Sequence, residues 1–163
     1  MSSIVLPEQR TGVGREGRAL EVLLSAEQSG GATSVLECFV AAGSSGPPVH
    51  VHPESDETFL VLAGTLLVYL DGVVTEVGEG GLMHVTRGVE HTFATDPSHD
   101  ARFLTIHTPG GFERFHAAAA AAAAERGGPL SRQELGMLAS TFDWRLQFPP
   151  RVLDPSGGVV EVG

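Results

Sequence analysis

The sequence predicts an all-β barrel or sandwich with a helical extension on its C-terminal side. Between residues 18 and 108, short alternating apolar runs are separated by Gly, Pro, Asp and Ser, a pattern typical of antiparallel β architectures. At Pro109 the composition changes, and residues 117–124 are eight consecutive alanines, the best helix former. We therefore expect a barrel over residues 1–112 and a helical tail over residues 113–163 that packs on it within one domain.

The expected strands follow one another at short intervals. Residues 19–26 and 33–40 have the pattern of two strands joined by a Gly-rich connection. Asp71-Gly72 separates two further apolar runs, and Asp-Gly at that position favours a two-residue hairpin turn with positive φ. These two runs are residues 65–70 and 73–77, and the other candidate strands are residues 57–62, 82–85, 91–95 and 101–108.

The tail contains signals for two helices. Phe112 and Phe115 are three residues apart, so they share one helix face and can anchor it to the barrel. Gly127-Gly128-Pro129 predicts the end of this helix. Ser131 and Glu134 form a capping box, which predicts the start of a second helix. We expect Leu135 and Leu138 to face inward, and the segment beyond them to be irregular and to pack through Phe142, Trp144 and Phe148.

Composition and charge narrow the classes of function. The formal net charge of −10 disfavours nucleic acid and anionic membranes as partners. The single cysteine, Cys38, cannot form an intramolecular disulfide. The first residues lack a secretory signal pattern, and no apolar run is long enough to cross a bilayer. We expect a soluble, cytoplasmic protein.

The segment PPVHVHPESDE, residues 47–57, predicts a metal site. His50 and His52 are two residues apart in a strand, so their side chains point to the same face. Glu57 follows a turn and can return its carboxylate to the pair, and His91 is the natural candidate for a donor from a neighbouring strand. Three imidazoles and a carboxylate suit one divalent transition metal, which could be Fe, Ni, Mn, Co, Cu or Zn.

Strand parity predicts which residues line a substrate pocket. Phe59 and Val61 share the face of Glu57, and Phe93 shares that of His91. The opposite wall comes either from Leu66 and Val68 or from Leu67 and Tyr69, because the register is not fixed by the sequence. His84 and His107 are further candidates: His84 either approaches the site or lies in a second layer or interface, and His107 either points into the barrel or forms hydrogen bonds at its mouth.

Two segments resemble the motifs of the cupin superfamily. Residues 46–64 contain the Gly, His-x-His, Glu and Gly of the first motif, with a Gly-to-His spacing shorter than usual that should alter only a loop, and residues 80–95 contain the Gly and His positions of the second. The sequence PGGFERF at residues 109–115 is similar to the end of bacterial quercetin 2,3-dioxygenases. Thr86 and Thr95 replace the Pro and Asn common in the second motif, but neither change removes a metal donor. The matching positions are Gly46, His50, His52, Glu57, Gly64, Gly80, Gly88 and His91.

The resemblance implies a fold, a ligand set and an activity. The fold is the cupin barrel, a double-stranded β-helix or jelly roll, and the metal ligands are His50, His52, Glu57 and His91. The implied function is that of a quercetinase-like dioxygenase acting on a small, largely apolar molecule, with Glu57 as ligand and as possible catalytic base. The alternatives are a non-oxidative isomerase or cyclase, and a binding protein without catalysis. The resemblance also implies a homodimer, formed through exposed sheet edges.

Overall fold

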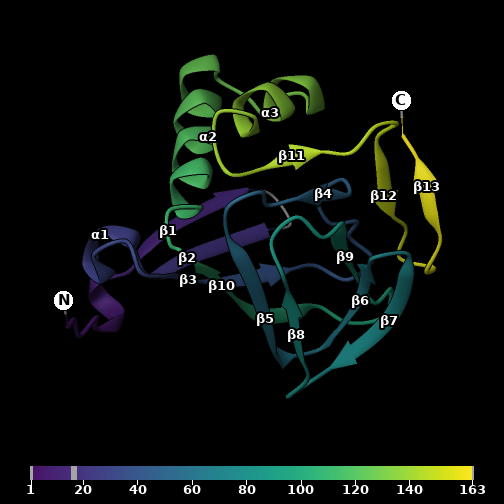
Figure 1. The fold of residues 1–163 in the computed structure, drawn as a ribbon, viewed down its shortest axis with the longest axis horizontal. Helices are drawn as coiled ribbons and strands as arrows, with labels where there is room; N and C mark the ends of the chain where they lie inside the picture. The colour runs from purple at the N-terminus through teal and green to yellow at the C-terminus, as the bar shows by residue number, and fades with distance from the viewer. Residues whose placement is uncertain (1, 16–17, 163) are drawn as a thin grey trace.

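The computed structural model describes residues 2–15 and 18–162, and most of the strands form two facing antiparallel sheets (Figure 1). The first sheet has the order β1-β2-β3-β10-β5-β8, and the second has the order β11-β4-β9-β6-β7. The bounds in the first sheet are β1 Thr11–Arg15, β2 Arg18–Leu24, β3 Ser34–Val40, β10 Ala101–Thr108, β5 Asp56–Ala63 and β8 Leu82–Val85. The bounds in the second sheet are β11 Arg145–Leu146, β4 His50–Val51, β9 His91–Thr95, β6 Thr65–Leu70 and β7 Val73–Gly78.

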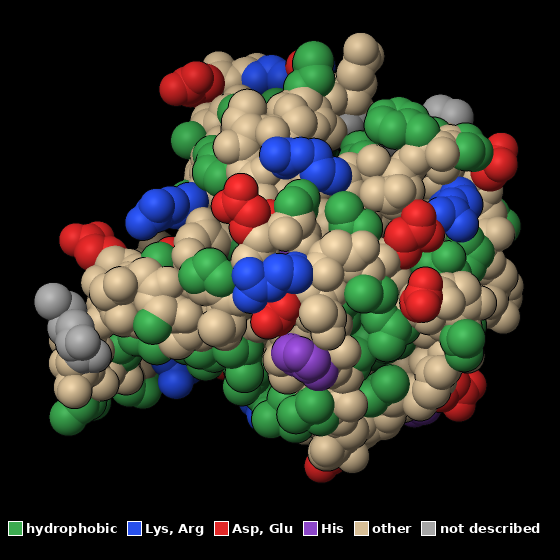
Figure 2. Space-filling model, in the orientation of Figure 1, with side chains coloured by type: hydrophobic (Ala, Val, Ile, Leu, Met, Phe, Trp, Pro, Cys, Tyr) green, Lys and Arg blue, Asp and Glu red, His purple; other side chains and the backbone are tan. Residues whose placement is uncertain are grey.

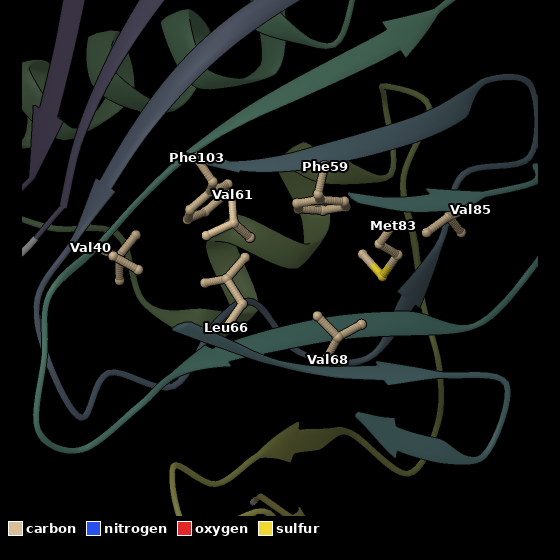
Figure 3. Packing of buried hydrophobic residues seen from close by; sticks show 9 residues of the cluster. Val40, Phe59, Val61, Leu66, Val68, Met83, Val85 and Phe103 are labelled. Atoms are coloured by element: carbon tan, nitrogen blue, oxygen red, sulfur yellow. The ribbon is translucent and has the colours of Figure 1, made fainter. Parts of the chain in front are cut away.

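The main core lies between the two sheets. Burial alternates along β5 and β10, as expected for strands that cover a core with one face. Phe59, Val61 and Phe103 from the first sheet point toward Leu66 and Val68 from the second (Figure 3). This packing settles the register that the sequence left open. Leu66 and Val68 face the interior, while Leu67 and Tyr69 belong to a second cluster on the outer face of their sheet.

The turn between β6 and β7 confirms the hairpin predicted at Asp71-Gly72. Leu70 pairs with Val73, and both intervening residues have positive φ, 46° at Asp71 and 88° at Gly72. Glycine adopts this conformation without steric cost, and Asp tolerates it. The two turn residues, Asp71 and Gly72, therefore set the register between β6 and β7.

The chain before β3 contains three elements that the sequence analysis did not predict, the first of which is the short 3-10 helix η1, Pro7–Gln9. β1 pairs along its length with β2, although its sequence, TGVGR, contains two glycines that weaken a strand signal. The connection from β2 to β3 includes the short helix α1, Ala26–Ser29, capped by Ser25.

The helical tail begins as expected. Helix α2 spans Glu113–Arg126 and ends at Gly127, whose φ is 75°. Helix α3 spans Arg132–Ala139 with the capping box predicted at Ser131. The aromatic and leucine side chains that join these helices to the barrel are Phe112, Phe115, Leu135, Leu138, Phe142, Trp144 and Leu146.

The prediction of an irregular end was wrong. β11 pairs with β4 and so adds the tail to the second sheet. β12, Arg151–Leu153, and β13, Val159–Glu161, form a hairpin beside that sheet, and Leu153 packs on its outer face (Figure 1). Phe148 was expected to pack on the body, but it lies in the turn between β11 and β12 and is 80% exposed.

One face of the surface carries its charge in a dispersed form (Figure 2). On the face seen in Figure 2, acidic and basic side chains are scattered among apolar and other residues. Asp56 and Arg87 form one of the surface ion pairs, with 3.1 Å between Oδ1 and Nε. Within the described residues, no helix has the length and apolar character needed to cross a bilayer.

Candidate metal centre

The four predicted ligands meet at one end of the barrel, where the two sheets come together. His50 begins β4, His52 follows that strand directly, and His91 begins β9 and is paired with His50. Glu57 is the second residue of β5, in the opposite sheet. Each of the four offers one ligand atom, and these atoms all lie within 4.8 Å of one another. All four side chains are buried.

Backbone carbonyls orient the three imidazole rings. The Nδ1 atom of His50 donates to the carbonyl of Pro48 at 2.8 Å, and that of His91 donates to the carbonyl of Val89 at 2.9 Å. The Nδ1 atom of His52 donates to the carbonyl of Asp143. Because a carbonyl can only accept, each Nδ1 carries a proton, and a neutral ring then presents a lone pair at Nε2. This is the usual arrangement of a metal-binding histidine.

The carboxylate of Glu57 faces these lone pairs. Its Oε2 atom lies 3.0 Å from Nε2 of His91 and 3.3 Å from Nε2 of His52. A carboxylate and a neutral ring nitrogen are both acceptors, so a cation must lie among them or the rings must be protonated. Among the described residues, Nε2 of His52 is a buried atom without a hydrogen-bond partner. This donor set fits a divalent transition metal.

The electrostatics of the cluster favour an ionised Glu57 carboxylate and a neutral His50 ring, whereas they favour the protonated form of His52. Burial would raise the pKa of Glu57, but His107, His52 and His91 outweigh it and hold the pKa well below its usual value. Burial, with the neighbouring His91 and His52, lowers the pKa of His50 well below 6.5. Burial also opposes the charge of His52, yet the contact with Glu57 is stronger and raises the pKa of that ring.

His107 is a fifth titratable residue in the cluster. It lies opposite Glu57 in the β10–β5 pairing and is fully buried. Its Nε2 atom is 3.2 Å from Oε1 of Glu57, and its ring centroid is 5.1 Å from that of His52. Within the described part of the chain, neither of its ring nitrogens makes a well-directed hydrogen bond. The sequence left open whether His107 points into the barrel or forms hydrogen bonds at its mouth, and in the structure it points into the barrel.

The structure does not bring His84 to the cluster. β8 pairs with β5 so that Val85 lies opposite Glu57 and His84 opposite Thr58. His84 is therefore on the outward face, where its Nδ1 and the hydroxyl of Thr58 share a hydrogen bond of 2.8 Å. There it borders a groove of about 270 Å³ together with residues of β6, β7 and β8.

The other three predicted pocket residues, Phe59, Val61 and Phe93, lie farther along the barrel interior than Glu57. Phe59 and Val61 are almost fully buried in the main core. Phe93 packs against that core, with its ring centroid 5.9 Å from that of Phe59 and 5.1 Å from that of Phe103. These side chains form a packed apolar floor beyond the cluster.

Two aromatic residues cover the cluster, Phe112 at the start of α2 and Trp144 in the tail, and sequence reasoning assigned them only to packing. The ring of Phe112 lies 4.7 Å from that of His52 and 4.6 Å from that of His107. Trp144 meets His50 edge to face at 5.0 Å. Phe112 lies only a few residues after His107, which was a usable signal. No local pattern pointed to Trp144, which lies in sequence far from every ligand.

Known proteins match the region that contains this cluster. Residues 36–107 match the cupin domain family. The oxidoreductase iacF of Pestalotiopsis fici is 40% identical over 60 residues, which are 36% of this chain and 29% of that protein. Quercetin 2,3-dioxygenase of Bacillus subtilis is 30% identical over 82 residues, 47% of this chain and 24% of the relative. The chain thus spans less than a third of the length of either curated relative.

A solved structure supports the same fold. The polyketide cyclase RemF of Streptomyces resistomycificus is similar with a TM-score of 0.55 and 25% identity, covering 66% of this chain and 80% of that one. The matched residues 36–107 include all four candidate ligands and His107. With two antiparallel sheets packed around one apolar core, the chain has the all-β fold of its cupin neighbours, and its residues 36–107 match the cupin domain family.

Proposed function

We propose that the protein is a metal-dependent enzyme that dioxygenates a small, largely apolar organic molecule, as a quercetinase does. The observation that carries the proposal is the convergence of buried ring nitrogens on the carboxylate of Glu57, an arrangement that a bound cation would satisfy. His50, His52, His91 and Glu57 would hold the ion. Bound there, it would supply Lewis acidity and, if redox-active, one-electron chemistry toward dioxygen.

The two oxygens of Glu57 have different surroundings, which suggests two roles. Oε2 faces the ring nitrogens of His52 and His91, as a ligand atom would. Oε1 faces His107 instead, at 3.2 Å from its Nε2 atom. We assign Oε1 as the base that accepts a proton from a substrate hydroxyl, with His107 beside it to share that proton.

The surroundings of the cluster favour an apolar, flat substrate. Phe112 and Trp144 cover the ligands with aromatic faces and edges and keep water away from them. No Lys or Arg occurs between residues 57 and 85, the part of the chain that contains β5 to β8. An anionic substrate would have no partner on those strands, whereas an aromatic ring could pack against the tail side chains.

Oxygen consumption tests this proposal directly. The protein is purified, its metal content is measured by elemental analysis, and Fe, Ni, Mn, Co and Cu forms are incubated with flavonols in an oxygen electrode. We expect substrate-dependent oxygen uptake that Glu57→Gln abolishes. Uptake by none of the metal forms would refute the dioxygenase assignment.

A second candidate is a non-oxidative cyclase or isomerase. It is favoured by the similarity to RemF, whose structure is that of a polyketide cyclase and which matches 66% of this chain. In this case Glu57 and His107 would move protons on a carbonyl substrate and dioxygen would not be consumed. Turnover of a polyketide or other carbonyl compound under strict anaerobiosis distinguishes this reaction from the first.

A further inference from the structure

We propose that Asp143 is a positioning residue for the metal ligand His52, so that the tail forms part of the metal centre. The inference rests on the proposed metal-binding function. His50 and His91 each donate to a carbonyl two residues earlier in their own segment. His52 differs, because it donates to the carbonyl of a residue 91 positions later in the chain. The orientation of this one ligand therefore depends on where the tail lies.

The side chain of Asp143 fixes its own carbonyl relative to the ligand loop. Oδ1 accepts from the backbone N–H of Glu54 at 2.8 Å, and Oδ2 accepts from the hydroxyl of Ser55 at 2.5 Å. Ser55 is almost fully buried, at 4% exposure. Glu54 and Ser55 lie in the turn that joins His52 to Glu57. The same residue thus holds both the ring of His52 and the turn that sets its distance from Glu57.

The residues after Asp143 keep it in place. Trp144 is 7% exposed and packs on His50 and on Phe115 of helix α2. In β11, Leu146 pairs directly with His50. A shift of this segment would therefore move the contacts of two ligands together, whereas a loop that only covered the site could shift without changing metal affinity.

The test compares Asp143→Ala with Asp143→Asn. Alanine removes both side-chain acceptors, whereas asparagine keeps an acceptor for Glu54 and can donate to the hydroxyl of Ser55. The matched control is Asp154→Ala, since Oδ1 of Asp154 accepts from the backbone N–H and the hydroxyl of Ser156 in an exposed turn of the tail. The probe is Co²⁺ alone, with affinity measured by chelator competition and ligand geometry by the visible absorption bands.

We expect Asp143→Ala to bind Co²⁺ about 10- to 100-fold more weakly than the wild type, with altered bands, because orienting partners of metal ligands have effects of this size. Asp143→Asn should restore both readouts, and Asp154→Ala should leave them unchanged. Wild-type affinity and bands in a folded Asp143→Ala protein would overturn the inference. Should that variant fail to fold, Ser55→Ala decides in its place: a weaker affinity with shifted bands supports the role, and unchanged values refute it. A wild type that binds no metal would instead refute the proposed function.

Discussion

Replacing His91 by Ala removes one candidate ligand and one partner of a buried carboxylate, and the two effects can be separated by thermal unfolding. His91 is 1% exposed and its Nε2 atom lies 3.0 Å from Oε2 of Glu57. Removing one member of a buried pair costs about 3–5 kcal/mol. In His91→Ala, Glu57 still has two partners, since Nε2 of His52 lies 3.3 Å from Oε2 and Nε2 of His107 lies 3.2 Å from Oε1. We therefore expect a smaller loss, about 1–3 kcal/mol, in the metal-free protein.

The loss of the contact with Glu57 and the loss of metal binding should each lower Tm. For a domain of this size 1 kcal/mol shifts Tm by about 2–4 °C, so metal-free His91→Ala should melt about 2–12 °C lower than metal-free wild type. A metal present at 100 times its Kd stabilises the wild type by about 2.7 kcal/mol, or about 5–11 °C. This metal-dependent increment should disappear in His91→Ala.

Calorimetry with and without a chelator measures both quantities. The control is Leu66→Ala, a fully buried residue of the main core, which should lower Tm through a loss of about 2–5 kcal/mol and keep the increment. A metal-dependent increment in His91→Ala equal to that of the wild type would show that His91 is not a ligand.

Four further results are expected. Metal affinity should begin to decrease already above pH 6.5 as the pH falls, because the contact with Glu57 outweighs burial and raises the pKa of His52, which must lose its proton to coordinate; titration calorimetry at several pH values would show no trend if this were wrong. His107→Gln should reduce kcat by about 10²- to 10⁴-fold at wild-type metal content, and an equal loss of metal would make His107 a ligand instead. The fluorescence of Trp144, the only tryptophan, should be quenched by Cu²⁺ but not by Zn²⁺, because its ring lies 5.0 Å from that of His50; equal responses to both ions would place the metal elsewhere. Gly64→Ala should lower the free energy of unfolding in urea by more than about 1 kcal/mol, because a Cβ atom there would lie 2.2 Å from the carbonyl oxygen of Asp100 at a φ of 76°, and unchanged stability would contradict this packing.

The clustering of the four candidate ligands could be predicted because their arrangement is mostly local. His-x-His places two rings on one face of a strand, and the motif supplied the offsets to Glu57 and His91. The structure also gives a physical reason for a motif glycine, since a Cβ atom at Gly46 would lie 1.9 Å from the carbonyl oxygen of Phe93. Local turn and capping chemistry likewise predicted the β6–β7 hairpin and both helices of the tail.

The remaining features depend on long-range register, which single residues do not encode. His84 faces outward only because β8 pairs with β5 in one of two possible parities. Asp143 and Trp144 reach the cluster because β11 returns to β4, and a pair of two-residue strands leaves little trace in a sequence. Because β11 returns to β4, Phe148 lies in the turn that follows β11, and its side chain is exposed there.

The carbonyl that orients His52 belongs to a residue 91 positions later in the chain. During translation, the ring and its acceptor therefore leave the ribosome at well-separated times, and the strands of both sheets, β11 excepted, have been synthesised before Asp143 appears. A nascent chain can thus form most of its barrel before the carbonyl of Asp143 is available to fix the tautomer of His52. High-affinity metal capture is then expected as a late step of maturation, so the ions at hand after synthesis would decide which one is incorporated.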